Sequence, residues 1–294
     1  MTNLRDAHVH VWSPDHERYP LAPGFSAADL WLPCFTPDDH ETISGAALPM
    51  NLVQMTWYGI DHSYILDLIT ADPNRFSGTG IVPAISDVSF PAPDRVMRAL
   101  AGGGIRAFRL RGRAAQPARE HASPTWLEHP AYEDVFACAA EEELALSFLC
   151  ATTDLAEISR MCDRFPRTRV ILDHCGGVRV RDHMIDSDDL RSLLSLAAHS
   201  EVYVKFGPIH GLADASGAGH PFLDTLPLLR AIVNVYGARR VMWETDLGGP
   251  IQMCNAAQDF AACVDLIERQ ADFLTPEQRQ QILGGTARRL FWPD

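Results

Sequence analysis

The sequence predicts one (β/α)₈ barrel spanning residues 1–294, and three observations carry that prediction. Short apolar segments rich in β-branched or aromatic residues, and bounded by Gly or Pro, alternate with longer helical patterns to the end of the chain. Eight such repeats imply parallel strands joined by helices and closed into a ring. The first strand also lacks the glycine-rich turn typical of the main alternative, an open doubly wound sheet.

Each element follows from its local pattern. The final helix begins near Thr275, which is a good N-cap residue followed by Pro276 and Glu277. The expected strands are 4–11, 51–55, 78–83, 105–110, 144–150, 170–174, 202–206 and 241–246, and the other expected helices are 63–71, 93–101, 132–142, 155–165, 187–198, 222–236 and 254–269.

Two connections are longer than a simple link between strand and helix. Residues 13–45 are rich in Pro, Asp and aromatic residues, and we expect them to fold over the mouth of the barrel. Residues 112–130, which include Arg113, Arg119, His121 and Trp126, form a second elaborated loop.

The composition excludes several classes of protein. The 38 acidic and 25 basic residues give a net charge of -13, which disfavours nucleic acid as a partner. No apolar run is long enough for a membrane helix, and no signal peptide is visible, so we expect a cytoplasmic protein. The seven cysteines are widely spaced without a CxxC motif, which indicates neither disulfides nor a zinc knuckle. The sequence is compatible with a homo-oligomer but does not fix the oligomeric state.

The first strand carries two histidines, His8 and His10, that should share one face of the strand. We expect Asp6 to lie beneath them on that face. The C-terminal end of a barrel strand is where active sites form, and two imidazoles there can share a metal ion or polarise a carbonyl. The alternative is a surface HxH motif on an edge strand.

Two other expected strands end in polar residues. Asp246 closes the eighth strand and can be a metal ligand, a general base or a helix N-cap. Glu244 lies one layer deeper, where pairing with Lys205 or Arg109 would offset its burial. His174 closes the sixth strand, and barrel closure would bring it to the same mouth. The neighbouring Cys175 is interpreted as an ordinary buried thiol.

The strands also carry cations that could bind a substrate. Arg106 and Arg109 are an odd number of residues apart, so we expect one to reach the pocket and the other to support the fold. Lys205 suits a substrate carboxylate or lactone oxygen, or an internal ion pair with Glu244. Tyr58 completes the predicted substrate-binding set with Arg106, Arg109 and Lys205.

Taken together, these motifs resemble the amidohydrolase superfamily, and most closely its amidohydrolase-2 branch, which contains sugar-acid lactonases and 2-pyrone-4,6-dicarboxylate lactonase. The resemblance covers nearly the whole chain. The motifs that carry it are Asp-Ala-His-Val-His at 6–10, Leu-Asp-His-Cys-Gly at 172–176, Val-Tyr-Val-Lys-Phe-Gly at 202–207, Trp-Glu-Thr-Asp at 243–246 and Ile-Leu-Gly-Gly-Thr-Ala-Arg-Arg-Leu-Phe at 282–291.

The resemblance implies a barrel hydrolase that opens a lactone or related ester, with catalytic and metal-binding roles for His8, His10, His174 and Asp246. Two departures from the pattern bear on the site. The fourth and fifth strands lack the bridging lysine and the histidine of two-metal members, so a two-metal site is not expected. Glu244 stands where this branch commonly has glycine, so the identity of the substrate is not carried over.

We therefore hypothesise that Asp246 activates a water molecule while the three histidines stabilise the oxyanion, with or without one divalent metal such as zinc. The substrate would be a sugar-acid lactone or a carboxylated pyrone or muconolactone-type lactone, and no organic cofactor is expected. One alternative is a metal-dependent decarboxylase of an aromatic or enol acid on the same fold. A non-catalytic binder of small acids is a further alternative.

Overall fold

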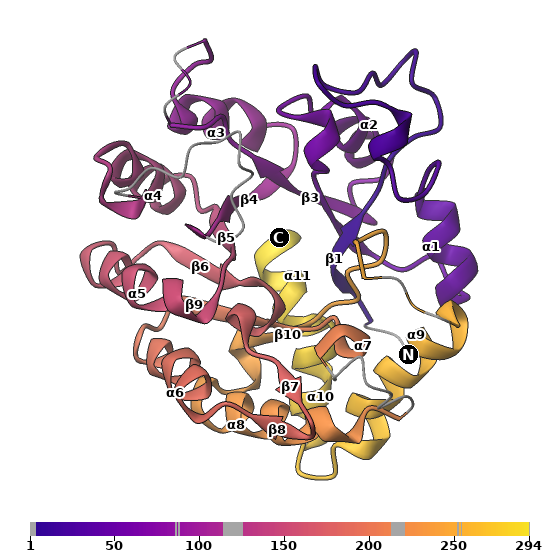
Figure 1. Ribbon diagram of the computed structural model, residues 1–294, viewed down its shortest axis with the longest axis vertical. Coiled ribbons are helices and arrows are strands. Elements are labelled where there is room, and N and C mark those ends of the chain that lie inside the picture. Colours follow the sequence, from indigo (N-terminus) through magenta and orange to yellow (C-terminus); the bar gives the residue numbers. More distant parts are fainter. Residues whose placement is uncertain are drawn as a thin grey trace.

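Eight parallel strands form one sheet in the computed structural model, in the order β1-β2-β3-β4-β5-β6-β9-β10, and helices surround them (Figure 1). This architecture confirms the predicted (β/α)₈ barrel. The structure describes residues 4–85, 87, 89–113, 126–212, 221–251, 253 and 255–293. The strands are β1 (Asp6–His10), β2 (Met50–Val53), β3 (Phe76–Ile81), β4 (Ile105–Arg111), β5 (Ala145–Leu149), β6 (Arg169–Leu172), β9 (Val202–Phe206) and β10 (Val241–Trp243).

Most helices lie where the sequence predicts them, because each has an apolar face that packs on the sheet. Two of them, at 63–71 and 93–101, have the predicted bounds. The α-helices are α1 (Pro37–Ser44), α2 (Ser63–Ala71), α3 (Pro93–Ala101), α4 (Ala131–Glu141), α5 (Leu155–Arg164), α6 (Ser187–Ser195), α7 (Ile209–Leu212), α8 (Leu226–Tyr236), α9 (Ala256–Asp265), α10 (Pro276–Gln280) and α11 (Thr286–Phe291).

The sequence does not predict α1 or the small hairpin of β7 (Val180–Arg181) and β8 (Met184–Ile185). Helix α1 lies inside the segment 13–45, which was expected to be a loop. A usable signal was present, since Thr36 caps the helix, Pro37 occupies its first turn and Asp39 completes a capping box.

The C-terminal helix closes one end of the barrel. Figure 1 shows α11 at the centre of the ring of strands, where Leu290 and Phe291 pack against the small side chains Ala7, Ala107 and Ala145. Small residues on three strands leave room for an aromatic side chain inside the barrel. This end is therefore filled with apolar side chains.

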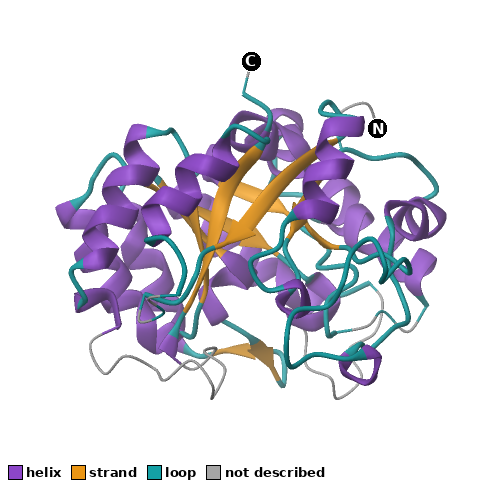
Figure 2. Cartoon of the chain, turned by 90° about the horizontal axis from the view of Figure 1, so that it is seen from above, coloured by secondary structure: helices purple, strands orange, loops and turns teal. Residues whose placement is uncertain are grey.

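The opposite end is where connecting segments gather. Figure 2 shows both termini at one end of the strands and the β7–β8 hairpin at the other. The segments that follow the strands are therefore free to build a site there, as in other barrels. Among the described residues, every helix is too short or too polar to span a lipid bilayer.

The six described cysteines are unpaired. Cys254 lies outside the described residues, as do Arg119 and His121 of the second elaborated loop.

Candidate active site

Strand β1 directs His8 and His10 toward the barrel interior. The two Nε2 atoms lie 3.2 Å apart. His10 Nδ1 is 2.9 Å from the carbonyl oxygen of Val53, to which it donates in the neutral ring. That bond leaves the Nε2 lone pair of His10 free to face the site.

Asp6 does not lie beneath the histidines, so that expectation is wrong. The pairing of β1 with β2 shifts register between Asp6 and Val9, so the strict alternation of faces does not hold across this part of the strand. The Asp6 carboxylate instead accepts hydrogen bonds from the backbone N–H of Thr245 (3.0 Å) and of His8 (3.2 Å), and lies 3.1 Å from His40 Nε2. Asp6 thus links β1 to the residues that directly follow β10, and the barrel closes between these two strands.

Asp246 follows β10, which ends at Trp243. Its N–H donates to the carbonyl oxygen of His8 (3.0 Å), and its φ of 55° is rare for a residue with a side chain. This backbone places Oδ1 at 3.5 Å from His8 Nε2 and 3.4 Å from His10 Nε2. Oδ1 is buried and has no hydrogen-bond partner among the described residues. Asp246 is not a helix N-cap, since the next helix begins at Ala256.

His174 lies in a left-handed turn directly after β6, with φ of 51°, and Cys175 follows at 55°. Conformations of this kind cost free energy and gather at functional sites. The carboxylate of Glu244 holds His174 from beneath, with Oε1 2.7 Å from the ring Nδ1. Burial raises the pKa of Cys175 to about 12, so its thiol stays neutral and is not an activated nucleophile.

Arg109 joins the two sides of the cluster. Its guanidinium lies 3.4 Å from His10 Nε2 and 3.3 Å from His174 Nε2. Arg106 does not reach the site. Its guanidinium donates to the carbonyl oxygen of Ala101 (3.4 Å) and lines a separate hollow with Trp292. The odd spacing therefore separates the two arginines as predicted, and the structure does not support the substrate-binding role predicted for Arg106.

Lys205 is fully buried below the site and does not line the cavity. Its Nζ lies 2.9 Å from the Asp173 carboxylate and 3.1 Å from His8 Nδ1. Asp173 also pairs with Arg109 Nε at 3.3 Å. The predicted ion pair between Lys205 and Glu244 is replaced by this one, and direct substrate contact by Lys205 is not supported.

Tyr58 also lies outside the cavity. Its hydroxyl accepts a hydrogen bond from the backbone N–H of Ser13 (3.0 Å), and only 3% of the residue is exposed. Tyr58 therefore anchors the start of the 13–45 segment, and its predicted contact with substrate has no support.

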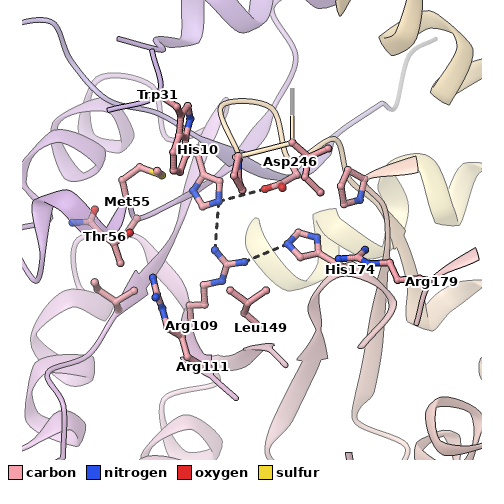
Figure 3. Close-up of a pocket in the computed structure, with 15 residues that line it drawn as sticks. His10, Trp31, Met55, Thr56, Arg109, Arg111, Leu149, His174, Arg179 and Asp246 are labelled. Carbon is pink, nitrogen blue, oxygen red and sulfur yellow. Dashed lines mark hydrogen bonds and ion pairs between the residues drawn. The ribbon is translucent and has the colours of Figure 1, made fainter. Parts of the chain in front are cut away.

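A cavity of ≈ 230 Å³ opens over the cluster. Figure 3 shows Arg109 between His10 and His174, with Asp246 beside His10. His8 does not line this cavity, whereas the other three predicted catalytic residues do. The lining residues are His10, Trp31, Gln54, Met55, Thr56, Ile81, Arg109, Arg111, Leu149, His174, Arg179, Pro208, Asp246, Pro250 and Ile251.

Eleven of the fifteen lining residues were not predicted, among them Arg111, Arg179 and Trp31. Arg111 could have been, because it follows Arg109 by two residues and therefore shares its face of β4. Arg179 and Trp31 come from connecting segments, for which the sequence offers no periodic signal. Trp31 confirms that the 13–45 segment reaches the mouth, and its Nε1 donates to the carbonyl oxygen of Gly248 (3.0 Å).

Burial and neighbouring charges shift the pKa values of the residues in the cluster in different directions. Burial lowers the pKa of His10 to about 4. Burial alone would lower the pKa of His174 too, but the carboxylates of Glu244 and Asp246 outweigh it and raise that pKa. Burial alone would raise the pKa of Asp246 and of Glu244. The neighbouring imidazoles lower both pKa values by more than burial raises them, and His174 has the largest lowering effect. The pKa of Glu244 falls to about 2, and that of Asp246 falls below its usual range. Both carboxylates are therefore ionised at neutral pH.

The donor set fits a divalent metal ion. One ligand atom from each of His8, His174 and Asp246 lies within 4.8 Å of the others. Two imidazole nitrogens and a carboxylate suit zinc, and Asp246 Oδ1, which accepts no hydrogen bond within the part of the chain that the structure describes, is available as a ligand. Arg109 competes with that use, because its guanidinium, a fixed positive charge, lies 3.3 Å from the His174 Nε2 atom that a metal ion would bind. A metal ion here requires Arg109 to move away from His174.

Comparisons with known proteins agree with the fold. A family profile described as Amidohydrolase matches residues 6–292. An L-fucono-1,5-lactonase from Burkholderia ambifaria is 26% identical over 297 residues, covering 98% of this chain and 94% of that protein. Two solved structures, each 20% identical, are similar in fold alone. A Pseudomonas putida protein that bears the name 2-pyrone-4,6-dicarboxylic acid hydrolase has a TM-score of 0.73 (99% and 98% covered). A zinc-bound amidohydrolase from Burkholderia multivorans has a TM-score of 0.72 (98% and 99% covered).

Proposed function

We propose that this chain, which belongs to the amidohydrolase family, is a hydrolase that opens the ring of a small lactone with water activated by Asp246. The similarity to a lactonase over almost the full length of both chains supports this reaction class. The observation that carries the proposal is Asp246 itself. Its Oδ1 lies among imidazoles at the wall of the cavity, is buried and accepts no hydrogen bond from the described residues.

Asp246 is the general base. Its lowered pKa keeps it ionised at neutral pH, so it can accept a proton from water at any working pH. A low pKa also makes it a weak base. The proton therefore transfers only as the new bond to the lactone carbonyl carbon forms, and the charge that develops on the carbonyl oxygen must be stabilised at the same time.

Arg109 and His174 supply that stabilisation. The guanidinium of Arg109 is permanently charged, and the carboxylates around His174 raise its pKa, which favours the imidazolium form. Both side chains line the cavity near His10 (Figure 3). When the tetrahedral intermediate collapses, Asp246 returns its proton to the ring oxygen that leaves as an alcohol.

His8 acts from beneath the cavity. It lies between Lys205 and Asp246 and orients Asp246 rather than touching the substrate. If a metal ion is present, His8, His174 and Asp246 would hold it, and it would supply a Lewis acid that polarises the lactone carbonyl. The acid–base role of Asp246 and the positioning role of Glu244 apply whether or not that ion is bound.

Product analysis on a panel of sugar lactones and carboxylated pyrone lactones tests the proposal. We expect ring opening with uptake of one water molecule. The loss of lactone absorbance or the release of acid measures this reaction. Evolution of carbon dioxide from an aromatic or enol acid, with every lactone left intact, would instead establish the decarboxylase. Binding of small acids without turnover of any substrate would establish the non-catalytic binder.

A further inference from the structure

The backbone of Asp246 has an unusual conformation at the position of the proposed general base. Its φ of 55° lies in the left-handed region, which costs free energy for a residue with a side chain. Such a conformation persists only where the surrounding structure holds it in place. The residues that hold this turn are therefore candidates for a role in the reaction.

One hydroxyl group fixes the backbone on both sides of Asp246. Thr245 Oγ1 donates to a carboxylate oxygen of Asp6 and accepts from the backbone N–H of Leu247 at 3.0 Å, so it spans the residue between them. The backbone N–H of Thr245 also donates to Asp6, at 3.0 Å. The Asp6 carboxylate thus holds the turn that carries Asp246 through two bonds to Thr245.

His40 holds Asp6 from outside the ring of strands. It lies in α1, which packs next to α9 (Figure 1), and its Nε2 is 3.1 Å from Asp6 Oδ2. Both side chains are fully buried. A carboxylate oxygen accepts, so His40 donates through Nε2. Its Nδ1 has no hydrogen-bond partner in the described parts of the chain, so the bond to Asp6 orients the ring.

Closure of the barrel does not depend on these contacts alone. Backbone bonds already join β1 to the residues after β10, from the Asp246 N–H to the His8 carbonyl oxygen (3.0 Å) and from the His10 N–H to that of Leu247 (2.8 Å). What the Asp6 bonds add is control of the carboxylate that lies 3.5 Å and 3.4 Å from two imidazole Nε2 atoms. A misplacement of about 1 Å at a reacting group can cost about 10²-fold in rate.

We propose that Asp6 and His40 are positioning residues for Asp246 and act on it through Thr245. This inference rests on the function proposed above, in which Asp246 is the general base. The segment 13–45 therefore has a second role besides covering the mouth of the barrel. Its helix α1 fixes the group that activates the water molecule.

Two pairs of variants test the proposal on the lactone that the wild-type protein opens. Thr245→Val removes the hydroxyl group and keeps the shape, and His40→Leu removes the N–H donor. We expect kcat to fall about 10- to 100-fold in the first and about 10-fold in the second, with KM within about three-fold of the wild-type value. Thr245→Ser and His40→Gln, which keep a donor, should retain kcat within about three-fold.

Thr286→Val is the matched control. Thr286 is fully buried in α11 at the closed end of the barrel, and its hydroxyl donates to the carbonyl oxygen of Ala238 (3.2 Å) and accepts from Arg289 (3.3 Å). Its replacement should lower the thermal unfolding temperature, as that of Thr245 does, and leave kcat unchanged. Thermal unfolding and circular dichroism of each variant show whether it folds.

A double-mutant cycle separates positioning from a general structural defect. In an Asp246→Asn background, Thr245→Val should lower the residual kcat by less than about two-fold, because the positioned base is already lost. Three results overturn the positioning role: an unchanged kcat in both Thr245→Val and His40→Leu, an equal loss in Thr286→Val, or the same fold-loss in the Asp246→Asn background as in the wild type.

If no lactone is hydrolysed, the proposed function fails and amide hydrogen exchange decides the positioning role separately. The hydrogen bonds link His40 to the Leu247 N–H through Asp6 and Thr245. Exchange of that N–H at least about ten-fold faster in His40→Leu, with the rates in β5 unchanged, supports the proposal. Equal rates in His40→Leu and the wild type overturn it.

Discussion

Replacing Glu244 by glutamine should lower the pKa of His174 while leaving the ring in place. Oε1 of Glu244 lies 2.7 Å from His174 Nδ1, and a glutamine carbonyl oxygen can still accept that hydrogen bond. The variant therefore removes the negative charge that faces His174 and keeps this hydrogen bond, and it also changes the contact between Oε2 and His8 Nδ1 (3.2 Å). Two unit charges about 4 Å apart interact by about 4 kcal/mol at an effective dielectric constant of about 20. Since one pKa unit corresponds to about 1.4 kcal/mol, the pKa of His174 should fall by about 2 to 3 units.

The assay is an NMR titration of protein labelled with ¹⁵N-histidine, with the His174 signal assigned from a His174→Gln variant. Glu41→Gln is the control, because Glu41 pairs with Arg75 at the surface (3.0 Å) and should leave the titration unchanged. The loss of imidazolium should also shift the pH profile of lactone hydrolysis to lower pH. A His174 pKa that stays within about half a unit of the wild-type value in Glu244→Gln would refute the assignment of Glu244 as its electrostatic partner.

Three further predictions concern the cluster. Arg109→Met, which frees the Nε2 atom of His174, should strengthen zinc binding about ten-fold or more in a competition titration with a chelating dye, and unchanged affinity would contradict the competition. The pKa of His10 is about 4 in the folded protein and 6.5 ordinarily, so folding favours the neutral ring. In metal-free protein the free energy of unfolding should therefore be highest above pH 6.5 and should fall by about 3 kcal/mol as the pH drops to 4. Denaturant melts should show this slope disappear in His10→Gln, and an unaltered slope would count against it. Lys205→Met leaves Asp173 with one fewer buried partner and should cost about 3 to 5 kcal/mol of unfolding free energy in the same melts, whereas a loss under about 1 kcal/mol would contradict the ion pair.

The elements could be predicted because their signals are local. Helix 63–71 and strand 202–206 match the structure at both ends, since hydrophobic periodicity and flanking polar residues define them. The meeting of His174 with His10 and Asp246 also followed from the sequence, because parallel strands of a barrel end at one rim.

The directions of individual side chains could not be predicted in the same way. Asp6 leaves the face of His8 where the pairing of β1 with β2 shifts register, and such a shift depends on a strand that is distant in the sequence. Lys205 pairs with Asp173 rather than Glu244 because the turn after β6 brings Asp173 to it, and a strand pattern does not encode that turn. Arg179 enters the cavity from a connecting segment, where spacing carries no information about direction.

Asp246→Asn tests the central claim most directly, measured as kcat/KM on whichever lactone the wild-type protein opens. Asparagine keeps the size of the side chain and removes the charge that accepts the proton, so we expect a loss of about 10³-fold or more with thermal unfolding close to that of the wild type. Turnover within about ten-fold of the wild-type value would show that another group activates the water molecule.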